Sequence, residues 1–314
     1  MTELTPYYKL SKEILSAQRM GKAIVVLEST VITHGLPRPE NLALAQELED
    51  IVRDEGAYPA TVGVLDGRVL VGMESDELEK LANDESAIKL SSRDLATAIA
   101  QSKSGGTTVA GTLRIAAQAG LRVFATGGIG GVHRGSTWDV SADLLELAKQ
   151  PLIVVCAGAK SILDLSASLE KLETLAVPVI GYKTLDFPAF YSIKSGLKLN
   201  GRVDSPREAV ELAQAHWKMG GRGIVLAQPP PKESAVSTKE MEAWTKQALE
   251  EAGNKGVQGQ EATPFLLKRV SELSEGKSLK ANLALLRNNA KLAAKISQEM
   301  LPQTKHAGLI PRKA

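Results

Sequence analysis

Short, almost unbroken runs of apolar residues recur along the chain, and most are followed by a segment with helical periodicity. The runs are rich in Val and Ile and lie at residues 23–27, 60–65, 69–72, 107–110, 121–126, 152–157, 177–182 and 223–227. Unbroken runs of this length are typical of strands that helices cover on both faces. The alternation therefore predicts an α/β sandwich with a largely parallel sheet.

Turn and cap signals refine this prediction. Asp66 and Gly67 separate two of the runs, and this pair is typical of a tight antiparallel hairpin. Ser205 followed by Pro206 signals the start of a helix. Further helices are expected at residues 41–55, 241–253, 263–273 and 279–301. Because no flexible linker separates the C-terminal helices from the rest, we expect a mixed sheet in a single domain.

Composition narrows the class of protein. The 314 residues include one Cys, so no disulfide scaffold is possible within the chain, and low Cys usage suits a reducing cytoplasm. With 38 Lys and Arg against 36 Asp and Glu, and only 4% aromatic residues, we expect no nucleic-acid partner. Residues 1–21 contain no apolar stretch of secretory or membrane type, so we expect a cytoplasmic protein with a small-molecule ligand.

Residues 125–135 (ATGGIGGVHRG) form a glycine-rich loop directly after a predicted strand. Five glycines allow the backbone N–H groups to approach a ligand, and His133 and Arg134 add two potential cations, which favours a phosphate. The spacing matches neither the dinucleotide fingerprint nor the Walker loop. A tight crossover loop without a ligand is the alternative interpretation.

Asp139, Ser141 and Asp143 alternate in the sequence that follows. In an extended segment their side chains would point the same way and offer the oxygen ligands that Mg²⁺ or Mn²⁺ prefers. The alternative is a capping cluster at the start of a helix over residues 144–149. Spacing alone leaves both interpretations open.

Lys160 follows the apolar run at 152–157. A lysine that a strand delivers to a dry pocket is poorly solvated as an ammonium, and its neutral amine can attack a carbonyl or an anomeric carbon. The alternative is a lysine that extends to solvent. Cys156, inside the run, is interpreted as a small core residue.

Glu28 follows the first apolar run, at the strand end where open α/β sheets hold their ligands. Partial burial would raise the pKa of Glu28 and suit it to proton transfer near neutral pH. The alternative is a carboxylate engaged by Ser29, Thr30 and nearby backbone. Lys89, beside hydroxyl groups in residues 89–94, is either a phosphate contact or a surface charge.

With these motifs identified, the sequence resembles the pseudouridine-5′-phosphate glycosidases, the family that includes the indigoidine-cluster protein A. The resemblance covers residues 9–301 and leaves residues 1–8 and 302–314 unmatched. It implies a three-layer α/β/α sandwich assembled as a homotrimer. The matching segments are LESTVITHGLP at 27–37, KLSSRDL at 89–95, GGTTVAGT at 105–112, FATGGIGGVHRG at 124–135, DVSADLLELA at 139–148, VVCAGAKSILDL at 154–165 and TPFLL at 263–267.

The resemblance implies reversible cleavage of the carbon–carbon glycosidic bond of pseudouridine 5′-phosphate with water, to uracil and ribose 5-phosphate. Such an enzyme is a hydrolase or lyase of pseudouridine catabolism. The family's nucleophilic lysine matches Lys160, which forms a Schiff base with the opened sugar. The family's acid/base glutamate matches Glu28.

Other site residues follow from the same resemblance. Asp139 matches the family's manganese ligand, with one Mn²⁺ per subunit and mostly water in the remaining coordination. Asn282 aligns with a family asparagine at the sugar–base site. We add Thr108 and His133 as phosphate contacts, because both lie in or near the glycine loop. Gln260 stands where the family commonly has lysine. The residues that match family substrate-binding positions are Lys89, Val109, Ser141, Ala142 and Asp143.

Two other functions remain open from the sequence. Lys160 would also serve a Schiff-base aldolase, and the site would suit a nitrogen-glycoside hydrolase acting on another sugar phosphate. A sugar-phosphate sensor without turnover is the non-enzymatic alternative. The joint presence of Glu28, Asp139 and Lys160 favours an enzyme.

Overall fold

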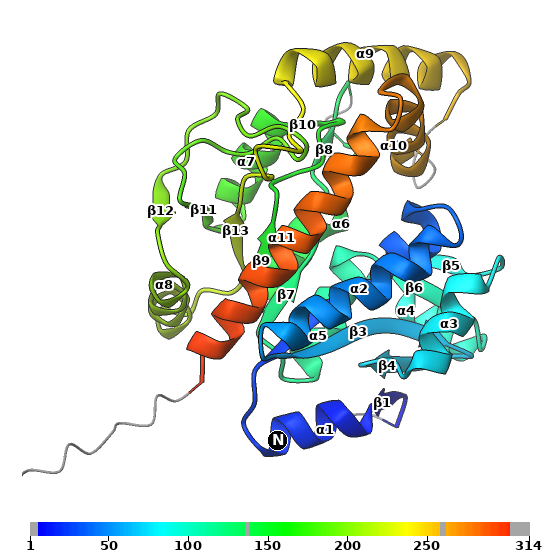
Figure 1. The fold of residues 1–314 in the computed structure, drawn as a ribbon, viewed down its shortest axis with the longest axis vertical. Helices are drawn as coiled ribbons and strands as arrows, with labels where there is room; N and C mark the ends of the chain where they lie inside the picture. Colours follow the sequence, from blue (N-terminus) through cyan, green and yellow to red (C-terminus); the bar gives the residue numbers. More distant parts are fainter. Residues whose placement is uncertain (1–5, 136–137, 258–261, 302–314) are drawn as a thin grey trace, which may run out of the picture.

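The computed structural model describes residues 6–135, 138–257 and 262–301, and an 11-stranded sheet lies at its centre (Figure 1). Gln260 and the C-terminal residues 302–314 lie outside this described part. The main order of the strands is β1 (Tyr8–Leu10), β4 (Arg68–Val71), β3 (Tyr58–Leu65), β2 (Ile24–Leu27), β7 (Val123–Ala125), β9 (Ile153–Cys156), β13 (Ile224–Ala227), β11 (Val179–Tyr182) and β12 (Gly201–Val203). β6 (Gly105–Thr107) pairs with β3 and with β5 (Ile88–Leu90).

The sheet is mixed, as predicted. β3 pairs antiparallel with β4 and β6, and the other strand pairs of this sheet in the described residues are parallel. Asp66 and Gly67 form the β3–β4 turn with φ values of 48° and 76°. These positive φ values are those that a tight hairpin requires, which confirms the turn predicted from the pair.

Helices cover both faces of the sheet, which confirms the three-layer sandwich. In Figure 1, α2 (Glu40–Asp54) and α11 (Lys277–Glu299) lie in front of the strands, with α5 (Val109–Gln118) and α6 (Ala142–Lys149) behind them. Helix α8 (Pro206–Lys218) packs against α11. The other α-helices in the described residues are α1 (Lys12–Arg19), α3 (Ser75–Asn83), α4 (Leu95–Ala100), α7 (Leu165–Thr174), α9 (Thr238–Asn254) and α10 (Ala262–Leu273).

Helix α11 joins the C-terminal part of the chain to the core. It crosses β2, β7 and β9 (Figure 1), and its residues Leu285, Ala290 and Ala293 are fully buried. The hydroxyl of Ser297 also donates a hydrogen bond of 2.9 Å to the carbonyl of Ile24 in β2. The apolar face of α11 is therefore part of the main core, which confirms a single domain.

One predicted strand is wrong. The apolar run at residues 107–110 was expected to be extended, but β6 ends at Thr107 and α5 begins at Val109. Thr108 caps this helix, because its hydroxyl oxygen accepts the N–H of Gly111 at 3.3 Å. A cap of this kind satisfies a free N–H group of the first turn and stabilises the helix.

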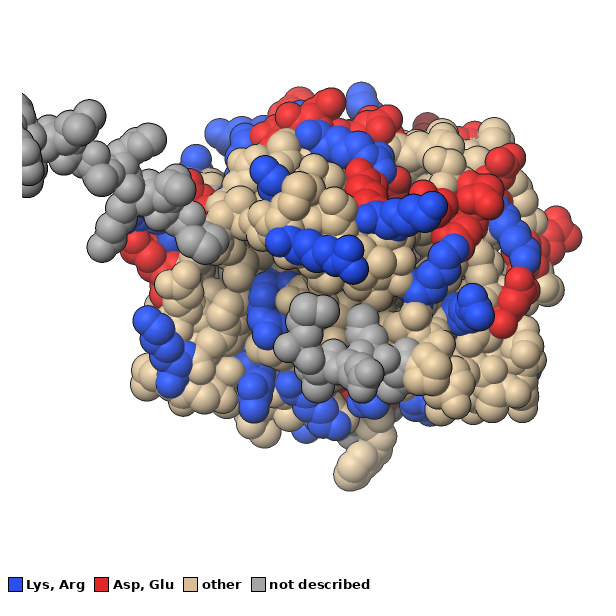
Figure 2. All heavy atoms as spheres, turned by 90° about the horizontal axis from the view of Figure 1, so that it is seen from below, with Lys and Arg blue, Asp and Glu red and all other residues tan. Residues whose placement is uncertain are grey.

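Charged side chains of both signs lie on the face of the molecule seen from below. Figure 2 shows Lys and Arg spread over this face, with many of the Asp and Glu side chains gathered toward one side. Among the described residues, no helix is long and apolar enough to cross a membrane.

Candidate active site

A cavity of about 70 Å³ lies at the carboxyl ends of the central parallel strands. Glu28, Lys89, Lys160 and Asn282 all line it, although they come from four distant parts of the sequence. Thr263, Pro264 and Leu267 from the first turns of α10 line the same cavity. The structure thus brings together four of the predicted site residues.

Glu28 directly follows β2, and Thr126 directly follows the neighbouring strand β7. The hydroxyl of Thr126 donates a hydrogen bond to Oε1 of Glu28. Burial raises the pKa of Glu28, and this effect outweighs the opposing influences of Lys160 and the Thr126 hydrogen bond. Glu28 is therefore suited to carry a proton at a higher pH than an exposed glutamate.

A short turn fixes the backbone of Lys160. Its N–H donates to the carbonyl of Ile129 at 3.1 Å, and its carbonyl accepts the N–H of Leu163 at 3.0 Å. Arg134 holds the same turn: Nε donates to the carbonyl of Leu163 at 3.1 Å, and Nη2 donates to that of Ser161 at 3.2 Å. The guanidinium expected to favour phosphate binding therefore binds the lysine turn.

Lys89 lies in β5 and is half-buried beside the other ionisable groups. Burial lowers the pKa of Lys89, and the positive charge of Lys160 lowers it further. The carboxylates of Asp143 and Glu28 act in the opposite direction. Two amines and two carboxyl groups therefore interact electrostatically within one site.

Asp143 does not belong to an extended metal-binding segment, which corrects one of the two interpretations left open above. Ser141 caps α6, its hydroxyl oxygen accepting the N–H of Asp143 at 3.2 Å, so Ala142 and Asp143 lie in the helix. The buried carboxylate of Asp143 accepts the N–H groups of Ala110 and Gly130, both at 2.8 Å. A side chain at Gly130 would place its Cβ 2.3 Å from the hydroxyl oxygen of Ser141. The glycine therefore permits a close internal contact with the start of α6.

Thr108 and Val109 lie at the amino end of α5, where the helix attracts anions. His133 lies in the two-residue strand β8 (Val132–His133), which pairs with β10 (Leu163–Asp164). Burial lowers the pKa of His133, with further influences from Asp139 and Lys160. None of these three predicted contacts lines the cavity of Glu28 and Lys160.

Asp139 presents a partly exposed carboxylate near His133. Oδ2 of Asp139 lies 4.0 Å from Nδ1 of His133, and 44% of the Asp139 side chain is exposed. Within the described part of the chain, no three His, Cys, Asp or Glu side chains cluster as a metal site. One exposed carboxylate fits a hard divalent cation that keeps most of its water ligands.

Several residues of the site were missed from the sequence. Thr126 is one, and its place after a predicted strand was a usable signal. Unlike Thr126, which reaches the site through its hydrogen bond to Glu28, His34 and Phe190 line the cavity directly. His34 lies in the π-helical turn η1 (Val31–Gly35), a conformation frequent at functional sites. Burial raises the pKa of Cys156 to about 12, which agrees with an unreactive core thiol.

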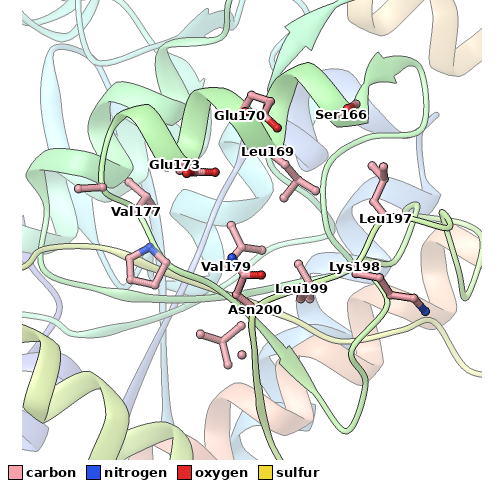
Figure 3. Close-up of a pocket in the computed structure, with 14 residues that line it drawn as sticks. Ser166, Leu169, Glu170, Glu173, Val177, Val179, Leu197, Lys198, Leu199 and Asn200 are labelled. Carbon is pink, nitrogen blue, oxygen red and sulfur yellow. The ribbon is translucent and has the colours of Figure 1, made fainter.

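A wider groove of about 680 Å³ lies at the opposite edge of the sheet, where β11 and β12 begin. Figure 3 shows Glu170 and Glu173 of α7 on one side of this groove, with Val179, Leu199 and Lys198 across from them. Lys198 forms an ion pair with Asp186 at 3.2 Å. The residues that line this wider groove include none of the predicted catalytic residues. The smaller cavity is therefore the candidate active site.

Comparison with known proteins adds to this geometry. Residues 13–299 match the family described as indigoidine synthase A like protein. Pseudouridine-5′-phosphate glycosidase 2 of Rhizobium johnstonii is 47% identical over 308 residues, which cover 97% of this chain and 99% of the relative.

Two solved structures share the fold. The crystal structure of an indigoidine synthase A-like protein from Thermotoga maritima has a TM-score of 0.87 and 36% identity, over 96% of this chain and 99% of the other. The prealnumycin C-glycosynthase AlnA, in complex with ribulose 5-phosphate, has a TM-score of 0.87 and 37% identity, over 95% and 98%. Because the family match spans most of the chain and both folds agree, the chain belongs to the indigoidine synthase A-like family.

Proposed function

We propose that this protein cleaves the carbon–carbon glycosidic bond of pseudouridine 5′-phosphate, reversibly and with water, to give uracil and ribose 5-phosphate. The observation that carries the proposal is the single cavity that Glu28, Lys89, Lys160 and Asn282 line. The relatives named as pseudouridine-5′-phosphate glycosidases support the substrate, and the sugar phosphate bound to AlnA supports the ligand class.

A carbon-linked base is a poor leaving group, so the reaction requires covalent catalysis. In the cleavage direction, the amine of Lys160 forms a bond to C1′ while the bond from C1′ to the ring oxygen breaks. A proton added to C5 of uracil then allows the C1′–C5 bond to break, with its electron pair staying on uracil. The nitrogen lone pair forms the C=N bond of the Schiff base.

Glu28 is the group that moves protons in this scheme. Its raised pKa lets it donate a proton to the ring oxygen when the sugar opens, and it then accepts a proton from the lysine nitrogen. The same proton can pass to C5 of uracil. Water finally adds to the C=N bond, which releases ribose 5-phosphate and the free amine of Lys160.

The substrate phosphate is proposed to bind beside Lys89 and the start of α5, where Thr108 and Val109 lie. His133 is the further phosphate contact that we propose, and Asn282 is the contact to the base. Drug-sized ligands occupy pockets of about 300 Å³ or more, whereas this cavity has about 70 Å³. We therefore expect the first turns of α10 to move when a nucleotide enters.

The manganese ion that the family implies is proposed to bind at Asp139, one per subunit. When bound there, it would supply a fixed positive charge and ordered water ligands. Paramagnetic resonance of added Mn²⁺ should show a bound fraction in the parent protein and its loss in Asp139→Asn. Full binding in that variant would exclude Asp139 as the ligand.

The assembly follows from the same resemblance, and the compartment follows from the low Cys usage of the chain. We propose a homotrimer in the cytoplasm. Light scattering of the purified chain tests the trimer directly, because the mass would be three times 33.4 kDa. A monomer would contradict this part of the proposal without affecting the chemistry.

The synthetic direction gives the sharpest test of the activity. Uracil and ribose 5-phosphate should yield a product whose base is carbon-linked and therefore resists acid hydrolysis. An acid-labile product would indicate a nitrogen-glycoside hydrolase. Cleavage of the sugar into smaller aldehydes would indicate an aldolase, and binding without any product would indicate a sensor.

A further inference from the structure

A second small cavity, of about 40 Å³, lies between α9 and the turn that follows Lys160. Side chains that line it include Arg134, Ser161, Ser192 and Thr245. None of the residues that line the catalytic cavity is among them. It is therefore a separate feature that the proposed reaction does not use.

Three hydroxyl groups around this cavity lack hydrogen-bond partners. Ser161, Ser192 and Thr245 are only 6%, 1% and 1% exposed, and their hydroxyl oxygens have no partner among the described residues. Buried polar groups nearly always have a partner, because leaving one unsatisfied is costly. Three such groups around one cavity indicate a ligand inside it.

Size and charge decide which ligand fits. A water molecule occupies about 30 Å³ in the liquid, so the cavity has room for one or two water molecules. Arg134 and Glu242 both line it, and their charges offset each other, so no net charge favours an anion. Hydroxyl groups both donate and accept, which suits water.

We propose that this cavity is a binding site for one or two ordered water molecules that join Thr245 of α9 to Ser161 and Ser192. Ser161 is the residue after Lys160, and α9 packs against α10, whose first turns line the catalytic cavity. The waters would therefore link α9, which supports α10 at the catalytic cavity, to the turn that contains Lys160.

A crystal structure with and without a bromide soak tests the ligand directly. The expected result is water density within hydrogen-bond distance of at least two of the three hydroxyls, with no anomalous signal from bromide. An empty cavity, or hydroxyls bonded to one another, would overturn the proposal. A bromide peak would assign the site to a small anion and would also overturn it.

Thermal melting of Thr245→Val provides an independent test. Valine keeps the shape of threonine but removes the partner of the water, so the melting temperature should fall by about 2 °C. The control is Thr174→Val on α7, where the exposed hydroxyl donates only to the carbonyl of Glu170, and little change is expected. If the melting temperature of Thr245→Val equals or exceeds that of the parent, the Thr245 hydroxyl binds no water, and the water site is refuted.

Discussion

The hydroxyl of Thr126 donates a hydrogen bond to the carboxylate of Glu28. The two residues lie side by side because the strands before them pair Leu27 with Ala125 in parallel register. The hydrogen bond stabilises the ionised carboxylate, whereas burial favours the protonated acid. Burial is the larger effect, so the pKa of Glu28 is raised overall.

Thr126→Val should raise the pKa of Glu28 further, because it removes a donor that favours the charged form. Activity that needs protonated Glu28 is present below its pKa and is lost as pH rises through it. The alkaline limb that Glu28 sets in the pH profile of kcat should therefore move to higher pH. Thr174→Val is the control, and a limb that stays in place or moves to lower pH would contradict the role of Thr126.

Glu28→Gln should separate activity from stability. The amide cannot transfer the proton, so turnover should fall by about a hundredfold or more. The same change removes a buried carboxyl group that is costly to ionise, so the melting temperature at neutral pH should stay level or rise. Pre-steady-state rates and calorimetry measure the two effects. A variant that unfolds earlier and keeps its turnover would contradict the acid/base role.

Lys160→Ala should abolish covalent capture of the sugar. With ribose 5-phosphate and borohydride, the parent should gain the mass of a reduced pentose phosphate at Lys160, and the variant should gain none. Lys183→Ala, which removes a lysine beside the ring of Tyr182, is the matched control and should label like the parent. Label on another lysine of the parent would exclude Lys160 as the nucleophile.

The sequence allowed Glu28 and Lys160 to be placed in one site because parallel strands end at one edge of the sheet. Glu28 and Lys160 each follow an apolar run, so both were expected at that edge, and one cavity contains them. The hairpin at Asp66 and Gly67 and the cap at Ser205 were equally local signals. Such features can be predicted because the residues that form them are neighbours in the sequence.

Residues whose partners come from distant elements could not be assigned in the same way. Arg134 was interpreted as favouring phosphate, since nothing in its own segment shows that it meets the carbonyls of Ser161 and Leu163. Asp143 likewise meets N–H groups of Ala110 and Gly130 that only the fold brings together. Alternation along the chain predicts the direction of a side chain, but it does not predict which backbone groups of other elements that side chain will contact.

Asp143→Asn should destabilise the protein and distort the site. The carboxylate accepts two backbone N–H groups at 2.8 Å, and an amide would turn its own donor toward one of them. The expected loss is about 2–3 kcal/mol of unfolding free energy, measured by denaturant titration. Asp164→Asn is a comparison in which the carboxylate accepts one N–H, that of Ala167, and its loss should be smaller. Equal stabilities of Asp143→Asn and the parent would contradict this role.

Arg134→Lys should impair the lysine turn without unfolding the protein. The guanidinium donates from Nε and Nη2 to two carbonyls of the turn, and an ammonium cannot reproduce this planar pair. Misplacement of Lys160 should lower kcat about tenfold or more and leave KM little changed, because Arg134 does not line the catalytic cavity. The melting temperature should change little, because the side chain is largely at the surface. Arg122→Lys, remote from the turn, serves as the control. A higher KM with parental kcat would instead make Arg134 a direct contact of the substrate phosphate and would end its assignment as a positioning residue.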